Sequence, residues 1–395
     1  MRSKLKTDYF FRSVRSGLMM AAVFLLVSSV GACARKGSTE QQSGIPVQQE
    51  ISSMLEYEDR MELDYAKEFA IDEYKDGYRL ISISDGSRFL VVPEGKEAPD
   101  DLEADIMVLN QPVDHIYLAA TAVMDMITSI DALDAIRLSG TKSSGWYIEE
   151  AKEAMEEGSI LYAGKYSAPD YERIVSEGCR LAIENTMINH APEVREKLEK
   201  FGIPVFLDYS SYETHPLGRV EWVKLYGVLL GKEEQAERAF DGEETAFEDA
   251  ICGEPTGKTV AFFFITTNGA VNVRKSSDYI PKMIELAGGT YVFDSLGDAQ
   301  SRSSSVTMQM EEFYAAAQDA DYLIYNSSID GEVGSIDELL GKSSLLGDFK
   351  AVQEGNVFCT TKNLYQESMS IGTLTKDIHS MLTGETEMTY LYRLP

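Results

Sequence analysis

The sequence contains few of the residues that build disulfide and metal sites. It holds four Cys and four His in 395 residues. The cysteines are widely spaced and form no CxxC pair, and neither an HExxH sequence nor a close pair of histidines occurs. A disulfide framework and a zinc ribbon are therefore not indicated.

Sequence motifs for phosphate binding and acyl transfer are also absent. The stretch "GVLLGKEE" lacks the GxxxxGK(S/T) spacing, "AGGTY" lacks GxGxxG, and no Ser stands in a GxSxG sequence. Paired carboxylates such as Glu149 and Glu150 are most simply solvated helix residues. We therefore expect a protein that is not an enzyme.

Basic residues are fewer than acidic residues. Lys and Arg number 36 against 65 Asp and Glu, which gives a net charge of −29 at pH 7. A chain of this sign repels polyanions, so nucleic acid is not an expected partner. The acidity either confers solubility or favours cationic ligands or a basic partner surface.

The chain begins with a targeting signal. The basic stretch "MRSKLKTDYFFRSVRSG" leads into a mostly apolar run, Leu18 to Ala32, which is too short to span a bilayer comfortably and fits a secretory signal. The run ends in "VGAC", which resembles the lipobox of bacterial lipoproteins. This resemblance implies a signal peptide over 1–32 and a lipid anchor at Cys33, on the extracytoplasmic face of the membrane. The polar, aperiodic residues that follow predict a flexible tether over 33–54.

Two series of short apolar strands and amphipathic helices follow a predicted β-meander. Alternation of apolar and polar residues over 68–95 predicts the meander. From Ile106 the pattern changes, and strands that begin near 136, 160, 180 and 204 recur at the spacing of βα units. A second series starts at 258–266. The rhythm predicts an α/β fold with two mainly parallel sheets.

The segment between the two series keeps helical periodicity and has no obvious strand. It predicts one long connecting helix over 216–252, interrupted, if at all, near Asp241-Gly242. The expected domains are therefore an N-terminal α/β lobe over 55–215, this helix, and a C-terminal α/β lobe over 253–395.

Several stretches resemble the iron-complex and vitamin B12 class of ABC-transporter substrate-binding proteins. They are "KYSAPDYERI", "KLEKFGIPVFLD", "EWVKLYGVLLGKEEQAE" and "YIPKMIELAGGTYVF", in this order behind a lipobox. The resemblance implies two α/β lobes joined by a single long helix, and no permanently bound cofactor. It further implies capture of a siderophore, haem or cobalamin-like corrinoid outside the cell, and delivery to a membrane permease driven by an ATPase. A monomer is expected.

The same resemblance implies where the permease docks. Matching "SAPDYERI" and "VTMQMEEFY" to the family pattern makes Glu172 and Glu311, one in each lobe, similar to the surface glutamates that pair with permease arginines. Glu312 competes with Glu311 for this role, because the helix is about one residue longer here.

Loops that follow strands are the places to search for ligand contacts. In open α/β sheets ligands bind outside the carboxyl ends of strands, and in a two-lobed binder these ends face one cleft. Aromatic rings that stack on a macrocycle or catechol, and cations that pair with its oxygens, suit a flat, partly anionic chelate. We expect Trp146 and Tyr147 to form an exposed aromatic pair. The full candidate set is Trp146, Tyr147, Lys165, Tyr166, Tyr212, His215, Arg274, Lys275 and Tyr279.

Two alternatives remain open. Three histidines, His115, His190 and His215, are predicted to follow strands of the first lobe, where they could hold free zinc or manganese if their nitrogens converged. The other alternative is a non-transport surface lipoprotein that binds protein or carbohydrate.

Overall fold

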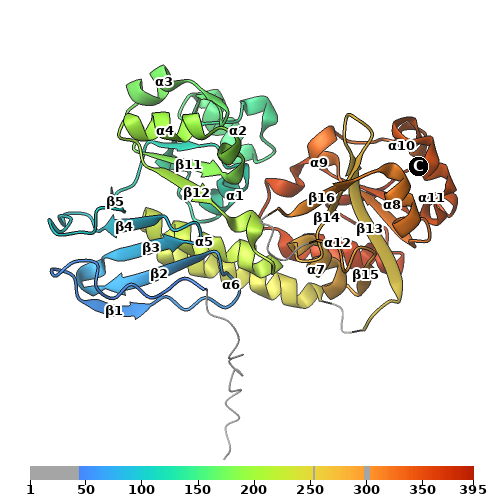
Figure 1. The fold of residues 1–395 in the computed structure, drawn as a ribbon, viewed down its shortest axis with the longest axis horizontal. Coiled ribbons are helices and arrows are strands. Elements are labelled where there is room, and N and C mark those ends of the chain that lie inside the picture. The colour runs from blue at the N-terminus through green and yellow to red at the C-terminus, as the bar shows by residue number, and fades with distance from the viewer. Residues whose placement is uncertain (1–43, 252–253, 298–302) are drawn as a thin grey trace, which may run out of the picture. The chain divides into compact units, whose positions relative to one another are not determined.

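Three sheets and a pair of central helices form the body of the protein (Figure 1). The computed structural model describes residues 44–251, 254–297 and 303–395. The predicted signal peptide and the lipidation site Cys33 lie outside these residues. These described residues form a single unit by their contacts.

The N-terminal sheet contains the predicted meander. Its strand order is β1-β2-β3-β4-β5, antiparallel up to β4, with β5 added in parallel. Both faces are buried, because Phe69 and Ile71 join the main core while Tyr74 and Leu80 pack in a smaller second core. The strand β5, expected to open the α/β series, is instead the edge of this sheet. The strands are β1 (Tyr57–Arg60), β2 (Phe69–Tyr74), β3 (Arg79–Ile83), β4 (Arg88–Val92) and β5 (Ile106–Asn110).

Residues 45–54 pack against the N-terminal sheet. Ile51 is 2% exposed and belongs to the second core. The backbone N–H of Gln48 donates to Asp72 (3.0 Å), and that of Ser53 donates to Asp101 (2.8 Å). The prediction that a flexible tether continues to residue 54 is therefore wrong for this stretch, because Ile51 is buried and two backbone N–H groups are bound by carboxylates.

A five-stranded parallel sheet and its helices form what we call the N-lobe. The strand order is β12-β11-β6-β7-β8. The strands predicted near 136, 160, 180 and 204 are confirmed as β7, β8, β11 and β12. The elements are β6 (Ile116–Leu118), α1 (Thr121–Ser129), β7 (Ile136–Ser139), α2 (Glu149–Glu157), β8 (Leu161–Tyr162), α3 (Tyr171–Ser176), β11 (Leu181–Asn185), α4 (Pro192–Lys200) and β12 (Val205–Asp208), with a small hairpin of β9 (Gly164–Lys165) and β10 (Ala168–Pro169).

The central segment consists of two helices, α5 (Pro216–Leu230) and α6 (Glu233–Ala250), that pack against each other. Gly231 ends α5 in the left-handed conformation (φ 68°), which glycine adopts at little cost. A Cβ at Gly227 would lie 2.5 Å from the Cβ of Ala236, so glycine lets the two helices approach closely. The prediction of one helix is corrected: the break falls at Gly231, whereas Asp241 and Gly242 lie inside α6.

A seven-stranded mixed sheet forms what we call the C-lobe. The strands β13, β15, β17 and β18 pair in parallel, whereas β14, β16 and β19 add antiparallel neighbours. The expectation of a mainly parallel sheet thus describes the N-lobe better than the C-lobe. The strands are β13 (Lys258–Ile265), β14 (Val271–Arg274), β15 (Gly289–Tyr291), β16 (Ser305–Met308), β17 (Tyr322–Tyr325), β18 (Val357–Thr360) and β19 (Leu391–Arg393).

Helices follow most strands of the C-lobe. They are α7 (Tyr279–Leu286), α8 (Met310–Ala317), α9 (Ser327–Asp330), α10 (Ile336–Lys342), α11 (Lys350–Gln353) and α12 (Ile371–Thr383). Helix α12 packs on α6 at Gly372, where a Cβ would lie 2.8 Å from the backbone of Ala246. This contact ties the C-lobe to the central pair of helices.

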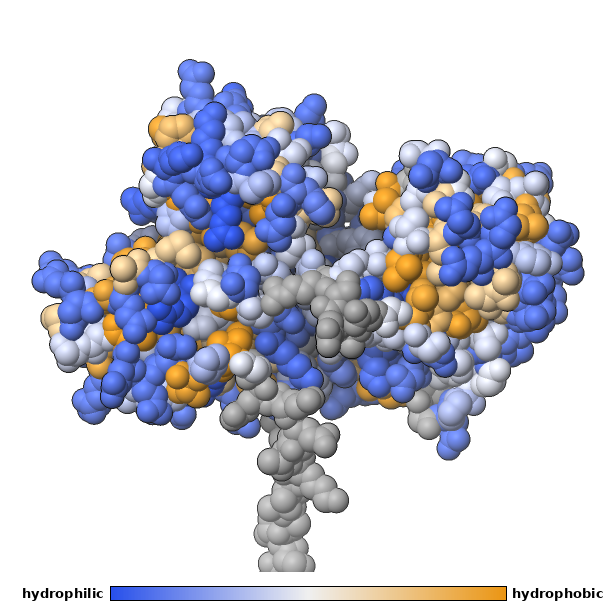
Figure 2. Space-filling model, in the orientation of Figure 1, coloured by the Kyte–Doolittle hydropathy of each residue, from blue (hydrophilic) through white to orange (hydrophobic). Residues whose placement is uncertain are grey.

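The two lobes also meet directly, through the loop that follows β18. The side chain of Gln366 donates to the carbonyl of Gly145 and accepts from the N–H of Tyr147, both at 2.8 Å. The N–H of Met369 donates to Asp125 on α1 at 2.7 Å. We call Asp125, Gln366 and Met369 the interlobe seam. Figure 2 shows the surface hollowed between the lobes, with hydrophilic side chains over most of this face.

Candidate ligand site

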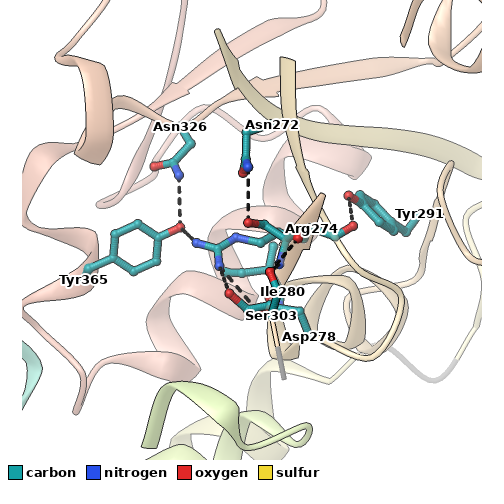
Figure 3. A network of polar contacts seen from close by, with 10 residues as sticks. Asn272, Arg274, Asp278, Ile280, Tyr291, Ser303, Asn326 and Tyr365 are labelled. Atoms are coloured by element: carbon teal, nitrogen blue, oxygen red, sulfur yellow. Dashed lines mark hydrogen bonds and ion pairs between the residues drawn. The ribbon is translucent and has the colours of Figure 1, made fainter. Parts of the chain in front are cut away.

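A polar network surrounds Arg274 at the end of β14 (Figure 3). Its guanidinium donates to the hydroxyl of Tyr365 and lies 3.5 Å from Asp278. Asn326, directly after β17, donates to the same hydroxyl at 3.1 Å. Figure 3 shows Tyr365 and Asn326 pointing toward Arg274 from loops after neighbouring strands. The carboxyl ends of β17 and β18 therefore converge on one cation, as the strand-end rule predicts.

Buried charge dominates this network. Burial works to lower the pKa of Arg274, but Tyr365 and Asp278 outweigh it and raise that pKa, so the guanidinium stays charged. Burial raises the pKa of Asp278, although Arg274 opposes this. Lys275 and Tyr279, both predicted contacts, are 4% and 3% exposed. Arg274 is thus already engaged by protein groups, and its role in ligand binding stays a prediction.

Arg219 of α5 approaches the same region from the other side. Its guanidinium carbon lies 4.9 Å from the centre of the Tyr279 ring, which begins α7 of the C-lobe. Burial raises the pKa of Asp208, the last residue of β12 in the N-lobe, and Arg219 is one of the groups that oppose this rise. Elements of both lobes therefore meet at Arg219, for which the sequence predicts a place in the connecting helix and no ligand role. The sequence signal that could have indicated a ligand role is the position of Arg219, a basic residue in the first turns of a helix that follows a strand end.

The aromatic pair at 146 and 147 is divided. Trp146 is 1% exposed, and its indole N–H donates to the hydroxyl of Ser139 at 3.1 Å. The expectation of two exposed rings is therefore wrong for Trp146, because the short helix over Ser143–Gly145 turns the indole back against the end of β7. Tyr147 is 39% exposed and remains a candidate contact.

Three other candidates lie in loops of the N-lobe. Lys165 is exposed and Tyr166 is half-buried beside it, in and after β9. Tyr212 is half-buried, with its ring 5.4 Å from that of Tyr209. Their binding roles stay predictions.

The three histidines do not form a metal site. His215 caps α5, because its Nδ1 accepts the N–H of Leu217 at 3.2 Å, and burial lowers its pKa to about 4. His115 precedes β6, so it lies at the amino end of that strand, whereas His190 follows the carboxyl end of β11. Among the residues that the structure describes, no group of three or more His, Cys, Asp or Glu could hold a metal ion. The three-histidine prediction is wrong, because His115 lies at the amino ends of the parallel strands, whereas His190 and His215 follow carboxyl ends.

Exposed apolar side chains occur after strand ends in both lobes. Met187, after β11, is 48% exposed, and Ile329, after β17, is 60% exposed. With Tyr147 after β7 they provide apolar contacts near the ends of three strands. Neither Met187 nor Ile329 could be predicted as a contact from the sequence, because an isolated apolar residue in a loop has no periodic signal.

The proposed docking glutamates are exposed in both lobes. Glu172 lies in the first turn of α3, and Glu311 and Glu312 lie in the first turn of α8. Their exposure leaves them accessible, and their pairing with a permease stays a prediction.

Two buried carboxylates, one just before α5 and one within it, have structural partners instead. Glu221 accepts the backbone N–H groups of Asp64, Tyr65 and Ala66 at 2.7–2.9 Å. Glu213 accepts those of Lys67 and Glu68 and the indole N–H of Trp222 at 2.9–3.0 Å. We call Glu213 and Glu221 the carboxylate clamp, because together they hold residues 64–68, which lead into β2, against α5.

The fold is that of ABC-transporter substrate-binding proteins, which confirms at this level the resemblance found in the sequence. A substrate-binding protein of Listeria monocytogenes EGD-e shares 17% identity at a TM-score of 0.52, over 68% of this chain and 98% of its own. A periplasmic heme-binding protein of Roseiflexus sp. RS-1 shares 20% at 0.52, over 69% and 98%. A periplasmic binding protein of Veillonella parvula shares 16% at 0.57, over 73% and 97%.

Relatives in sequence carry the name lipoprotein. Two uncharacterized lipoproteins of Methanocaldococcus jannaschii are each 24% identical, over 354 and 349 residues. The matches cover 83% and 84% of this chain, and 81% and 86% of the relatives. No protein-family model matches the chain. Within the described residues, no helix is both long and apolar enough to cross a membrane.

Proposed function

We propose that the protein is the extracytoplasmic receptor of an ABC importer, and that it captures an iron chelate or a metallated tetrapyrrole between its lobes. The observation that carries this proposal is the convergence of strand ends from both lobes on one region that holds the Arg274 network and Arg219. Cations beside exposed apolar side chains suit a ligand with a flat organic body and anionic oxygens. Siderophores, haem and corrinoids have this character, and the protein acts on them by binding rather than by catalysis.

The sequence around Cys33 supports the proposed location on the membrane. The lipobox-like "VGAC" and the lipoprotein names of two relatives support a lipid anchor at Cys33. The anchored receptor then delivers its ligand to a permease with its ATPase, as a monomer.

Titration of the mature protein tests the ligand class. The probes are hemin, a corrinoid, ferric siderophores and free Zn²⁺ or Mn²⁺, and the readout is tryptophan fluorescence. The buried Trp146 reports on its neighbour Tyr147, so a ligand that covers Tyr147 changes the emission. We expect a Tyr147→Ala variant to bind the preferred chelate about 3- to 10-fold more weakly.

A Phe201→Ala variant, which removes another exposed ring (48% exposed), is the matched control and should bind like the wild type. Tight binding of free zinc or manganese alone would refute the chelate proposal. A surface lipoprotein that binds protein or carbohydrate would bind none of these probes.

Docking is tested separately from binding. Replacing Glu172 and Glu311 together by Arg should abolish uptake in cells and leave ligand affinity unchanged, because exposed charges set the register of an encounter rather than the ligand pocket. Glu234, whose side chain is 91% exposed on α6, gives the control variant Glu234→Arg. Normal uptake by the double variant would remove this part of the proposal.

A further inference from the structure

Arg219 is a buried cation whose hydrogen-bonding capacity is unused. The residue is 4% exposed, yet its guanidinium makes no hydrogen bond or ion pair to any residue that the structure describes. A guanidinium offers five N–H donors, and buried charges are normally paired. Its nitrogens are also not among the fully enclosed polar atoms without partners, so they retain some contact with solvent.

The carboxylates nearest to Arg219 are committed elsewhere. Asp208 accepts from the hydroxyls of Tyr226 (2.7 Å) and Ser210 (2.6 Å). Asp278 caps α7 by accepting the N–H of Ile280 at 3.0 Å, and its other oxygen faces Arg274. Burial raises the pKa of both carboxylates and the charge of Arg219 opposes the rise, but neither carboxylate forms an ion pair with it. In a chain of net charge −29, an unpaired buried cation is a local exception.

The ring of Tyr279 fixes one side of this guanidinium. At 4.9 Å from the ring centre, the cation rests against an aromatic face that is itself 3% exposed. Such stacking immobilises the planar group while leaving its N–H edges free for a partner. An anion with two neighbouring oxygens, such as a carboxylate or catecholate, matches that edge in two parallel hydrogen bonds.

We infer that Arg219 binds an anionic oxygen pair of the ligand at the junction of the two lobes, and so selects chelates with exposed carboxylate or catecholate groups. The inference rests on the proposed function in so far as it assumes that the bound solute is a chelate. It adds a contact from the connecting segment to the loop residues proposed above. Neutral and cationic complexes, such as ferric hydroxamates, are disfavoured because they leave the guanidinium unpaired.

Binding measurements on matched variants test this inference. The variants are Arg219→Gln and Arg219→Lys, with Arg238→Gln as the control, because Arg238 lies on the surface of α6 with a side chain 68% exposed. The anionic probes are hemin, ferric citrate and a ferric tricatecholate, and ferrioxamine B is the cationic probe. We expect Arg219→Gln to weaken the best anionic probe by about 10-fold or more, and Arg219→Lys by less, because Lys keeps the charge but lacks the paired donors. Arg238→Gln should bind within about 2-fold of the wild type.

The outcomes separate this inference from the proposed function. Equal affinity of wild type and Arg219→Gln for the best anionic probe would overturn the role of Arg219 and leave the receptor proposal intact. Tight binding of ferrioxamine B and of none of the anionic probes would likewise overturn the role of Arg219 and leave the receptor proposal intact. If no chelate binds, the proposed function fails. The role of Arg219 is then tested by the melting temperature in the presence of free citrate. A rise in melting temperature that requires Arg219 supports the anion site, and the absence of such a rise refutes it.

Discussion

The carboxylate clamp and Arg219 are neighbours on one chain segment, but they differ in how their charges are satisfied. Glu213 and Glu221 together accept the backbone N–H groups of residues 64–68, and Glu213 also accepts an indole N–H. Arg219, two residues before Glu221, is also buried but makes no hydrogen bond through its guanidinium within the described chain. The two carboxylates of the clamp have their hydrogen-bond partners within the protein, whereas the guanidinium of Arg219 does not. The difference separates groups that hold the fold from a group that is available for binding.

The largest expected effect comes from breaking the clamp. Glu221→Ala leaves three backbone N–H groups without an acceptor, that of Ala66 buried and those of Asp64 and Tyr65 partly buried, and we expect it to lower the free energy of unfolding by about 3–5 kcal/mol. Urea and thermal unfolding measure the loss. The control is Glu237→Ala, because Glu237 also faces Lys224 (3.4 Å) but has a side chain 59% exposed, and it should change stability by less than about 0.5 kcal/mol. A Glu221→Ala protein as stable as the wild type would remove the distinction between clamp and cation.

How much of this difference could be predicted from the sequence depends on the range of the interactions. The order of strands and helices was predictable, because apolar periodicity and stop signals act over a few residues. The burial of Trp146 was not, because its partner Ser139 is reached by a turn whose direction the local pattern does not specify. The carboxylate clamp could not be predicted either, because Glu221 accepts backbone N–H groups that lie more than 150 residues earlier in the sequence. The break at Gly231 was visible as a glycine, but the helical periodicity on both sides concealed it.

A second effect, which grows as the pH rises, concerns another buried group without a partner, Glu184 of β11. Both of its carboxylate oxygens lack a hydrogen bond within the described chain, and burial raises its pKa to about 8. Unlike Arg219, an acid can escape an unpaired charge by keeping its proton, so we expect Glu184 to be neutral at pH 7. The folded state then holds a proton that the unfolded state releases, and stability falls as pH rises from about 4.5 to 8.

The substitution Glu184→Gln tests this behaviour. The neutral amide removes the pH dependence, so the variant should gain on the wild type by up to about 1.4 kcal/mol per pH unit across that window. Melting temperatures measured from pH 5 to 8.5 report the difference. Glu196→Gln, at an exposed glutamate of α4, is the control and should leave the profile unchanged. Parallel profiles for Glu184→Gln and the wild type would show that Glu184 finds a partner in solution.

The smallest expected effect lies at the interlobe seam, where one carboxylate is only partly satisfied. Asp125 accepts the N–H of Met369 at 2.7 Å, and burial raises its pKa to about 6, with Glu367 and Glu150 adding to the rise against the opposing effect of Met369. Half-buried Glu243 of α6, with a pKa raised to about 7 by burial, is also near enough to be affected by Asp125. Because an acid with a raised pKa stabilises the folded state less as pH increases, the seam should loosen between about pH 4 and pH 6 and stay looser above.

An Asp125→Asn variant separates the hydrogen bond from the charge. The amide oxygen still accepts the N–H of Met369, but it cannot ionise beside Glu243 and Glu367. We expect hydrogen exchange over residues 366–372, corrected for the intrinsic rate, to be slower in this variant than in the wild type at pH 7.5, by an amount equivalent to about 1 kcal/mol. At pH 3.5, below the window in which the seam loosens, the two should exchange alike, and Asp131→Asn, just past the end of α1, should match the wild type throughout. Equal exchange at pH 7.5 would mean that Asp125 is fully satisfied by Met369, which would place the seam with the carboxylate clamp rather than with Arg219.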